Sequence, residues 1–283
     1  MKKIGNILIV MFAALSMIRC GDFLDVQQYV KDMQQYDSIF VRENTTKQWL
    51  WEVYSSLSST PSLSNGALYF ASDEAIYNDA NASCELYQNG QYSSTNPVWE
   101  DRYNAMYVGI RTASIFIHNV HRCLEVSSAE RERMEGEARF LRAYFYWIAL
   151  DVFGDVPFTT ETSPFGGGVN PKQASRKDVF DYCISELTDL ASDESAMPAA
   201  RSNYPRADKG AVNGLLARMY LNAEVYAGTP MWTEAKSACE AIFGMGYSLC
   251  PEYSDLFRGD NGENADALKE IIFGVAYDAE QTQ

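Results

Sequence analysis

Apolar residues recur every three or four positions over most of this chain, which is the spacing of one face of an α-helix. The spacing predicts helices at about 45–58, 98–123, 128–152, 176–191, 208–226 and 233–243. Thr45 or Thr46 suits the N-cap of the first helix, and Ser127 or Ser128 suits that of the third. Gly154 and Pro157 are expected to end the third helix. We therefore expect a mainly α fold in which antiparallel helix pairs alternate with loops.

The last two helices have small residues where a close neighbour would be needed. The two facing sets are Ala211, Leu215, Ala217 and Tyr220 on one helix, and Trp232, Ala235, Ala238 and Ala241 on the next. Small residues with large ones between them are typical of tetratricopeptide-like helix pairs. We predict that architecture, although the sequence has no clear repeat.

The end of the chain has a different period. Residues 270–277 alternate between two sets of side chains, one of which holds Ile271, Phe273, Val275 and Tyr277. Such alternation predicts a short C-terminal strand. Because no second strand follows it, we expect the sequence to be incomplete at this end.

The segment 136–158 combines two arginines with many aromatic residues. Helical spacing places six apolar side chains in the core: Phe140, Ala143, Tyr144, Trp147, Ile148 and Leu150. Arg139 and Arg142 are expected to pair with nearby acids or to extend towards solvent. The acids just before them, Glu130, Glu132, Glu135 and Glu137, are expected to face solvent in the first turns of the helix, where they suit its dipole.

One long segment, 60–97, has no helical pattern and is rich in Ser, Asn, Gly and Tyr. Loops of this length in a compact domain usually have a function. Tyrosine and tryptophan rings can stack on the apolar face of a sugar, while amides and carboxylates bond its hydroxyl groups. The candidate ligand-binding residues are Asp73, Tyr77, Asn78, Asn81, Tyr87, Asn89, Tyr92 and Trp99.

The alternative for these residues is structural. Trp99 shares a helical face with Tyr103 and Met106, which favours a place in the core. Tyr77, Tyr87 and Tyr92 suit a ligand contact and a loop that folds back on itself equally well.

The net charge of the chain argues against one class of binding partner. The 283 residues include 38 acidic and 23 basic side chains, a formal net charge of −15. This charge repels phosphate backbones and anionic lipid surfaces, so nucleic acid is not expected as a partner.

The first 19 residues resemble a secretory signal, with Lys2 and Lys3 followed by an apolar run too short to span a bilayer. Cleavage before Cys20 would leave a cysteine that can carry acyl chains, and residues 20–44 would form a tether. Arg19 is unusual at such a site, and plain secretion is the alternative. The other five cysteines are expected to be buried free thiols, with a Cys239–Cys250 bridge as the alternative.

Three other kinds of functional site have weaker support in the sequence. His118, His121 and Cys123 lie within two helical turns, but no second ligand cluster accompanies them, so neither a metal nor another cofactor is expected. No pair of carboxylates has the context of a glycosidase. The glycines at 166–168 lack the lysine of a phosphate-binding loop and are expected to form a linker.

Several segments together resemble the SusD/RagB family, the nutrient-uptake lipoproteins of the Bacteroidetes outer membrane. They are CGDFLD at 20–25, VWEDRYNAMYVGI at 98–110, GEARFLRAYFYWIALDVFGDVPF at 136–158, DKGAVNGLLARMYL at 208–221, and the YSDLF and KEIIFGVAYD motifs near the end. The sequence departs from the family pattern at Arg19 and at 111–117. Family members are typically about twice as long, so the resemblance implies that this chain is an N-terminal portion.

The resemblance also implies a function. It indicates a lipoprotein anchored at Cys20, with residues 45–283 as an incomplete SusD-like helical domain. The protein would bind oligosaccharides at the cell surface and deliver them to a SusC-like TonB-dependent transporter, without catalysis or a cofactor. Two alternatives remain open from the residues alone, a tetratricopeptide-like scaffold that binds a protein or peptide, and a secreted glycoside hydrolase.

Overall fold

The computed structural model describes residues 39–59, 86, 88–91, 93, 97–163 and 170–275. The expected signal peptide, the lipidation residue Cys20 and most of the tether lie outside these residues. So do six of the eight candidate ligand-binding residues, namely Asp73, Tyr77, Asn78, Asn81, Tyr87 and Tyr92.

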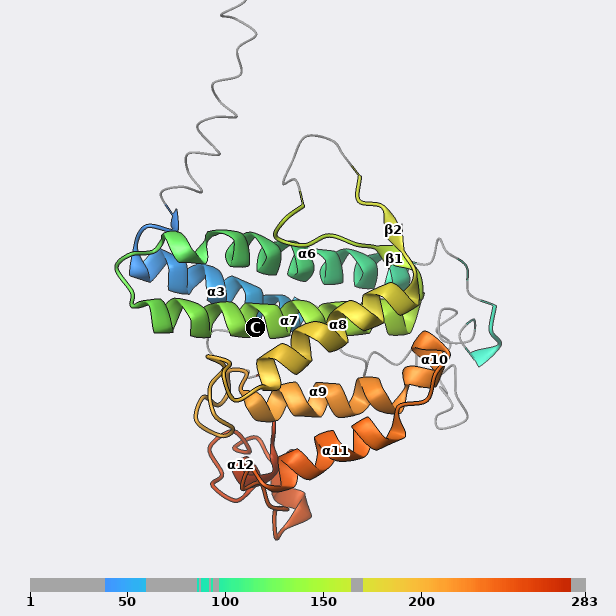
Figure 1. Cartoon of the computed structure of the whole chain (residues 1–283). Helices are drawn as coiled ribbons and strands as arrows, with labels where there is room; N and C mark the ends of the chain where they lie inside the picture. Colours follow the sequence, from blue (N-terminus) through green and yellow to red (C-terminus); the bar gives the residue numbers. More distant parts are fainter. Residues whose placement is uncertain are drawn as a thin grey trace, which may run out of the picture.

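The described chain is mostly helical (Figure 1). Its α-helices are α3 (Glu43–Ser59), α6 (Pro97–Asn119), α7 (Ser128–Phe153), α8 (Arg176–Ala191), α9 (Lys209–Leu221), α10 (Ala223–Ala227), α11 (Trp232–Phe243) and α12 (Ala267–Glu270). Two 3₁₀ turns, η2 (Val120–Arg122) and η3 (Tyr253–Phe257), join them. The strands β1 (Val156–Pro157) and β2 (Gln173–Ala174) pair antiparallel, with Val156 opposite Ala174. The predicted mainly α fold is confirmed.

Side-chain caps fix where three of the helices begin. The Ser127 hydroxyl accepts a hydrogen bond from the Glu130 N–H at 3.2 Å, and Ser175 accepts one from the Asp178 N–H at 3.1 Å. The Asp208 carboxylate accepts bonds from two N–H groups at the start of α9. Each cap satisfies donors that have no partner within the helix. The predicted cap at Ser127 is confirmed, as is the end of α7 at Gly154, whose φ is 77°.

Two helix boundaries differ from the prediction. Helix α3 starts at Glu43, so neither Thr45 nor Thr46 is its N-cap; the Thr45 hydroxyl instead donates to the Arg42 carbonyl at 3.1 Å. The predicted helix 208–226 is two helices, which meet at Asn222. At both places a polar side chain donates to a nearby carbonyl, Thr45 to Arg42 and Asn222 to Arg218, and apolar periodicity does not report such bonds.

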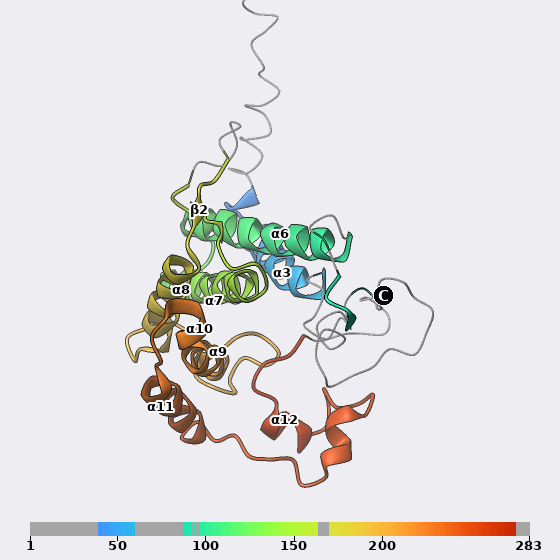
Figure 2. The ribbon, with the colours of Figure 1, turned by 90° about the vertical axis from the view of Figure 1, so that its right-hand side faces the viewer.

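The helices pack as successive antiparallel neighbours. Helices α3, α6 and α7 pack against one another, α8 crosses α7, and α9 and α11 lie side by side below (Figures 1 and 2). The core is continuous through this stack, and the six apolar side chains predicted on α7 are buried or, for Tyr144, half-buried within it. Helix α7 is therefore the central element of the described fold.

The predicted contact between α9 and α11 is correct at its centre and wrong at its ends. Ala211, Leu215, Ala235 and Ala238 are buried. Trp232, however, is 62% exposed, and Ala241 is also exposed. Trp232 is the first residue of α11, and helical side chains tilt towards the N-terminus, so its ring projects beyond the partner helix.

The predicted C-terminal strand is wrong over the described residues. Glu270 ends α12, and residues 271–275 form no ladder with another described segment. Phe273 instead packs edge-on against Phe140 of α7, with 5.3 Å between the ring centroids. Phe273 thus packs on α7, while Ile272 lies near Gly214 of α9, so the alternating pattern does not reflect a sheet.

The described cysteines are free thiols. Cys123, Cys183 and Cys250 are buried, as expected, whereas Cys239 is exposed. No Cys239–Cys250 bridge forms. None of the described helices has the length and apolar character needed to cross a bilayer.

Candidate functional site

The candidate loop is described at only a few positions. Gly90, with a φ of 63°, forms a turn that the Gln91 N–H closes by donating to the Leu86 carbonyl at 2.8 Å. Asn89 lies in this turn with its side chain exposed. An exposed amide is available to a ligand, so Asn89 keeps the role proposed for it.

Trp99 follows the loop, in the first turn of α6. Its ring is half-buried, and the guanidinium of the fully buried Arg102 lies 5.5 Å from the ring centroid. This cation–π contact holds the ring in place. The structure thus gives Trp99 a packing role, and its contact with a ligand remains a prediction.

Tyr103 and Tyr107 of α6 form a row of aromatic rings with Phe153 of α7. The Tyr103 ring lies 4.6 Å from that of Tyr107 and 5.4 Å, edge to face, from Phe153 of α7. The Tyr107 hydroxyl donates to the Pro157 carbonyl at 2.6 Å, and burial raises the pKa of Tyr107. These contacts join α6 to the end of α7 and to β1.

Glu137 corrects a prediction from the sequence, because it is fully buried and does not face solvent. Arg206 binds both of its carboxylate oxygens, at 2.8 and 2.6 Å. The Tyr54 hydroxyl donates to the same carboxylate at 2.6 Å and accepts a bond from the Ala207 N–H at 2.9 Å. Burial raises the pKa of Glu137, against the opposite effect of Arg206.

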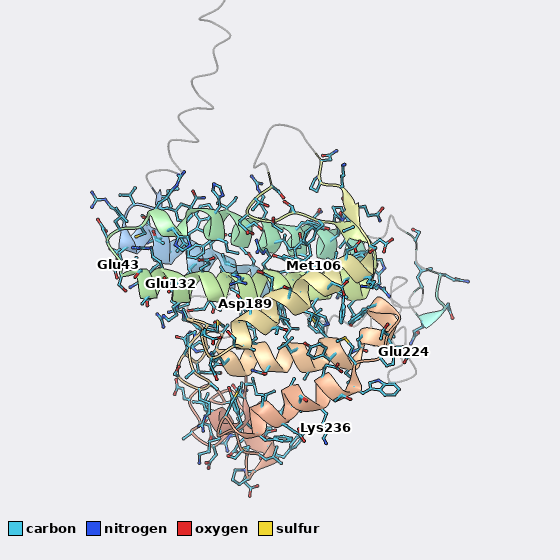
Figure 3. The ribbon with its side chains drawn as sticks, in the orientation of Figure 1. Glu43, Met106, Glu132, Asp189, Glu224 and Lys236 are labelled. Carbon is cyan, nitrogen blue, oxygen red and sulfur yellow. The ribbon has the colours of Figure 1, made fainter. Side chains whose placement is uncertain are left out.

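The burial of Glu137 could have been predicted from its spacing in the sequence. Glu137 is three residues from Met134 and from Phe140 and four from Leu141, all buried, so it lies on the core face of α7. Glu132 is exposed, as predicted, and is labelled on the early part of α7 in Figure 3.

The two arginines of α7 are held by acids. Arg142 is 2% exposed and binds Glu161 and Glu186, the latter at 3.2 Å. Arg139 binds both oxygens of Glu186 at 3.1 and 3.0 Å, and Asp189 at 2.8 Å. The predicted pairing with acids is confirmed, and Arg142 does not extend to solvent. These arginines join α7 to α8 and to the 158–163 segment, which is a structural role.

The histidines and the cysteine at 118–123 bind separate groups. His118 Nδ1 lies 3.0 Å from the Glu161 carbonyl oxygen, and His121 Nε2 lies 2.6 Å from Glu135. The Cys123 thiol donates to the Val41 carbonyl. Across the described residues no group of three His, Cys, Asp or Glu side chains is arranged to hold a metal ion.

Comparison with known proteins identifies relatives. The chain is 36% identical over 158 residues to the starch-binding protein SusD of Bacteroides thetaiotaomicron, a match that covers 56% of this chain and 28% of SusD. It is 23% identical over 287 residues to a SusD-like protein of Formosa agariphila, covering 96% of this chain and 52% of that one. This chain therefore spans about half the length of these relatives or less.

The fold has a similar counterpart among solved structures. A SusD-like protein of Bacteroides fragilis superimposes with a TM-score of 0.69 at 24% identity, over 85% of this chain and 46% of the other. A family model described as starch-binding and associating with the outer membrane matches residues 22–221. On this match, which spans most of the chain, the protein belongs to the SusD-like family.

Proposed function

We propose that this protein is a surface lipoprotein that binds oligosaccharides and delivers them to a SusC-like TonB-dependent transporter. The observation that carries the proposal is the match of residues 22–221 to a family described as starch-binding and associated with the outer membrane. The name of its relative SusD, a starch-binding protein, supports a glycan as the ligand class. We expect no catalysis.

The binding surface in this proposal is the loop before α6. Its tyrosines, Tyr77, Tyr87 and Tyr92, supply stacking faces, and Asp73, Asn78, Asn81 and Asn89 supply hydrogen-bonding groups. The exposed side chain of Asn89 supports this role, because its amide is open to the hydroxyl groups of a ligand.

Affinity electrophoresis tests glycan binding. The protein is run through gels that contain amylopectin, laminarin, xylan or galactomannan, beside the Tyr77→Ala/Tyr87→Ala/Tyr92→Ala variant. We expect at least one polysaccharide to retard the wild type, and the loop variant to lose that retardation. Tyr253→Ala, at an exposed tyrosine of η3, is the control and should behave as the wild type does. Unretarded migration of the wild type in every gel would contradict the proposal.

The anchor is tested separately. The mature protein should partition into detergent and incorporate labelled palmitate, because acyl chains on Cys20 add a large apolar surface. Cys20→Ala should abolish both, while Cys239→Ala, at an exposed thiol, should change neither. Label that persists in Cys20→Ala would show that the anchor is elsewhere.

A further inference from the structure

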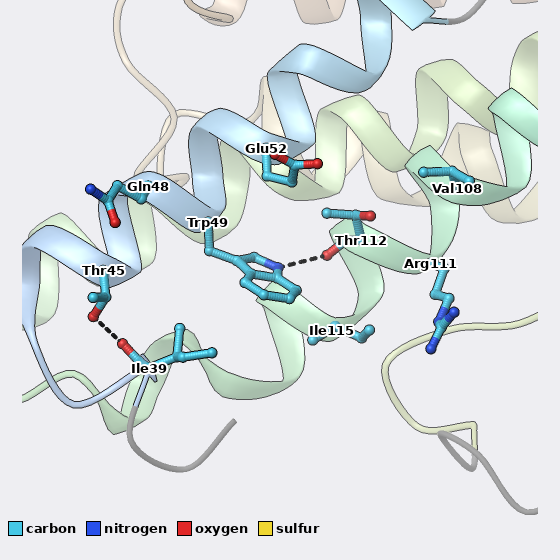
Figure 4. A pocket seen from close by; sticks show the side chains of 9 residues that line it. All are labelled: Ile39, Thr45, Gln48, Trp49, Glu52, Val108, Arg111, Thr112 and Ile115. Atoms are coloured by element: carbon cyan, nitrogen blue, oxygen red, sulfur yellow. Dashed lines mark hydrogen bonds between the residues drawn. The ribbon is translucent and has the colours of Figure 1, made fainter. Parts of the chain in front are cut away.

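The outer surface of α3 and α6 has a groove of about 530 Å³ that the proposed loop site does not use (Figure 4). Its volume is within the range of small-molecule sites, about 300–1,000 Å³. The lining residues are Ile39, Thr45, Gln48, Trp49, Glu52, Val108, Arg111, Thr112 and Ile115.

Trp49 lies at the centre of the groove, between the two helices (Figure 4). Its indole N–H donates to the Thr112 carbonyl at 3.3 Å, and its ring packs on Phe40 with 5.4 Å between centroids. The indole nitrogen is thus satisfied and the ring orientation fixed. What the ring offers to a ligand is apolar surface that is already in position.

Three side chains around the ring can form hydrogen bonds with a ligand. Gln48, Glu52 and Arg111 are exposed, and the side chain of none of them forms a hydrogen bond or ion pair with a described residue. They provide an amide, a carboxylate and a guanidinium, so both donors and acceptors are available. Most other charged side chains that line the described pockets are already paired with neighbours, such as Arg133 with Glu130 and Arg206 with Glu137.

The charges of Glu52 and Arg111 cancel, which gives no preference for an anionic or a cationic ligand. A tryptophan ring with both donors and acceptors around it suits a neutral ligand that has an apolar face and many hydroxyl groups. We propose that the α3–α6 groove is a second saccharide-binding site, separate from the loop. This inference rests on the proposed function, since it assumes that the protein meets glycans.

Fluorine NMR tests the site directly. All five tryptophans are replaced by fluorotryptophan, and the Trp49 resonance is assigned by its loss in Trp49→Phe. The probes are maltoheptaose, laminariheptaose, xylohexaose and a galactomannan oligosaccharide. We expect at least one probe to shift the Trp49 resonance in the wild type and also in the Tyr77→Ala/Tyr87→Ala/Tyr92→Ala variant.

Matched variants test the polar groups of the groove. Glu52→Ala/Arg111→Ala should raise the probe concentration needed for half of the Trp49 shift about tenfold, since bonds to charged groups are lost. Glu234→Ala/Lys236→Ala removes the same charges from α11, where both side chains are exposed and Lys236 is labelled in Figure 3, and should change nothing.

The outcomes separate the two proposals. A Trp49 resonance that no probe moves, in a protein that polysaccharide still retards, would overturn the groove site alone. A shift that disappears in the loop variant would also overturn it, because the signal would then come from the loop. If no polysaccharide retards the protein and no probe shifts any tryptophan resonance, both proposals fail.

Discussion

Glu137 joins three parts of the chain that are distant in sequence. Its carboxylate binds Tyr54 of α3 and Arg206 of the segment before α9, and Tyr54 in turn binds the backbone of Ala207. A buried carboxylate is costly unless its oxygens are paired, and here both are. The group thus fixes how the helices on the two sides of α7 are placed.

Removal of this carboxylate should destabilise the fold. Glu137→Ala leaves Arg206 and Tyr54 without their partner, and breaking a buried ion pair costs about 3–5 kcal/mol. The free energy of unfolding, measured by urea denaturation, should fall by that order. Glu132→Ala, on the exposed side of the same helix, should change it by no more than about 0.5 kcal/mol. Equal midpoints for the two variants would show that the buried network is not stabilising.

At the scale of elements, α6 and α7 approach each other closely at Gly109. A Cβ atom added there would lie 2.6 Å from the ring of Phe145, which is fully buried. Glycine is thus required by the approach of the two helices and not by its backbone conformation.

Two glycine substitutions separate packing from helix propensity. Gly109→Ala should lower the free energy of unfolding by about 1–3 kcal/mol, the usual cost of overpacking. Gly214→Ala on α9, where the nearest atom is 3.9 Å away, should be neutral or stabilising by up to about 1 kcal/mol, because alanine favours helix. Thermal unfolding followed by circular dichroism measures both, and a stable Gly109→Ala would contradict the close contact.

The helices could be predicted from the sequence because each buries one face, so its apolar residues repeat with the helical period. The failed strand at 270–277 shows the limit of this reasoning. Its apolar residues alternate, but Phe273 contacts α7, and no local pattern reports a partner more than a hundred residues away. For the same reason the partners of Glu137 and Arg142 could not be predicted, although the position of Glu137 on the core face of α7 could have been.

At the scale of the whole molecule, buried tyrosines make the stability of the fold depend on pH in the alkaline range. Burial is the main cause of a raised pKa at Tyr54, Tyr107, Tyr146, Tyr182 and Tyr226. In the unfolded chain a tyrosine ionises near pH 10. Above that pH the unfolded state binds fewer protons than the folded state, so stability falls as pH rises.

We therefore expect the free energy of unfolding to decrease steadily above about pH 10. Urea denaturation at a series of pH values measures it, while tyrosinate absorbance follows ionisation. The folded protein should show fewer ionised tyrosines than the protein in urea at the same pH. Identical titration curves for the two states would show that these hydroxyl groups are not protected.

For the candidate site, the sequence could predict only which residue types it contains, and not how they are arranged. The loop's tyrosines and asparagines indicate a class of ligand, but their arrangement depends on backbone conformations that no periodic pattern constrains. Trp99 is the exception, since its helical position alone placed it beside Tyr103. The domain boundaries and the roles of the loop residues remain predictions.

The pairing of α3 with α6 also has a consequence for how specificity can change. Two of the contacts that join the chain before the 60–96 segment to α6 are the ring pair of Phe40 with Phe116 and the bond from Trp49 to Thr112. Glu137 and Gly109 fix α7 against the same two helices without that segment. A foreign loop grafted between Ser59 and Pro97 would leave these contacts in place. With the loop as the proposed ligand site, relatives of this protein could exchange ligands by recombination within this segment while they keep these helix contacts.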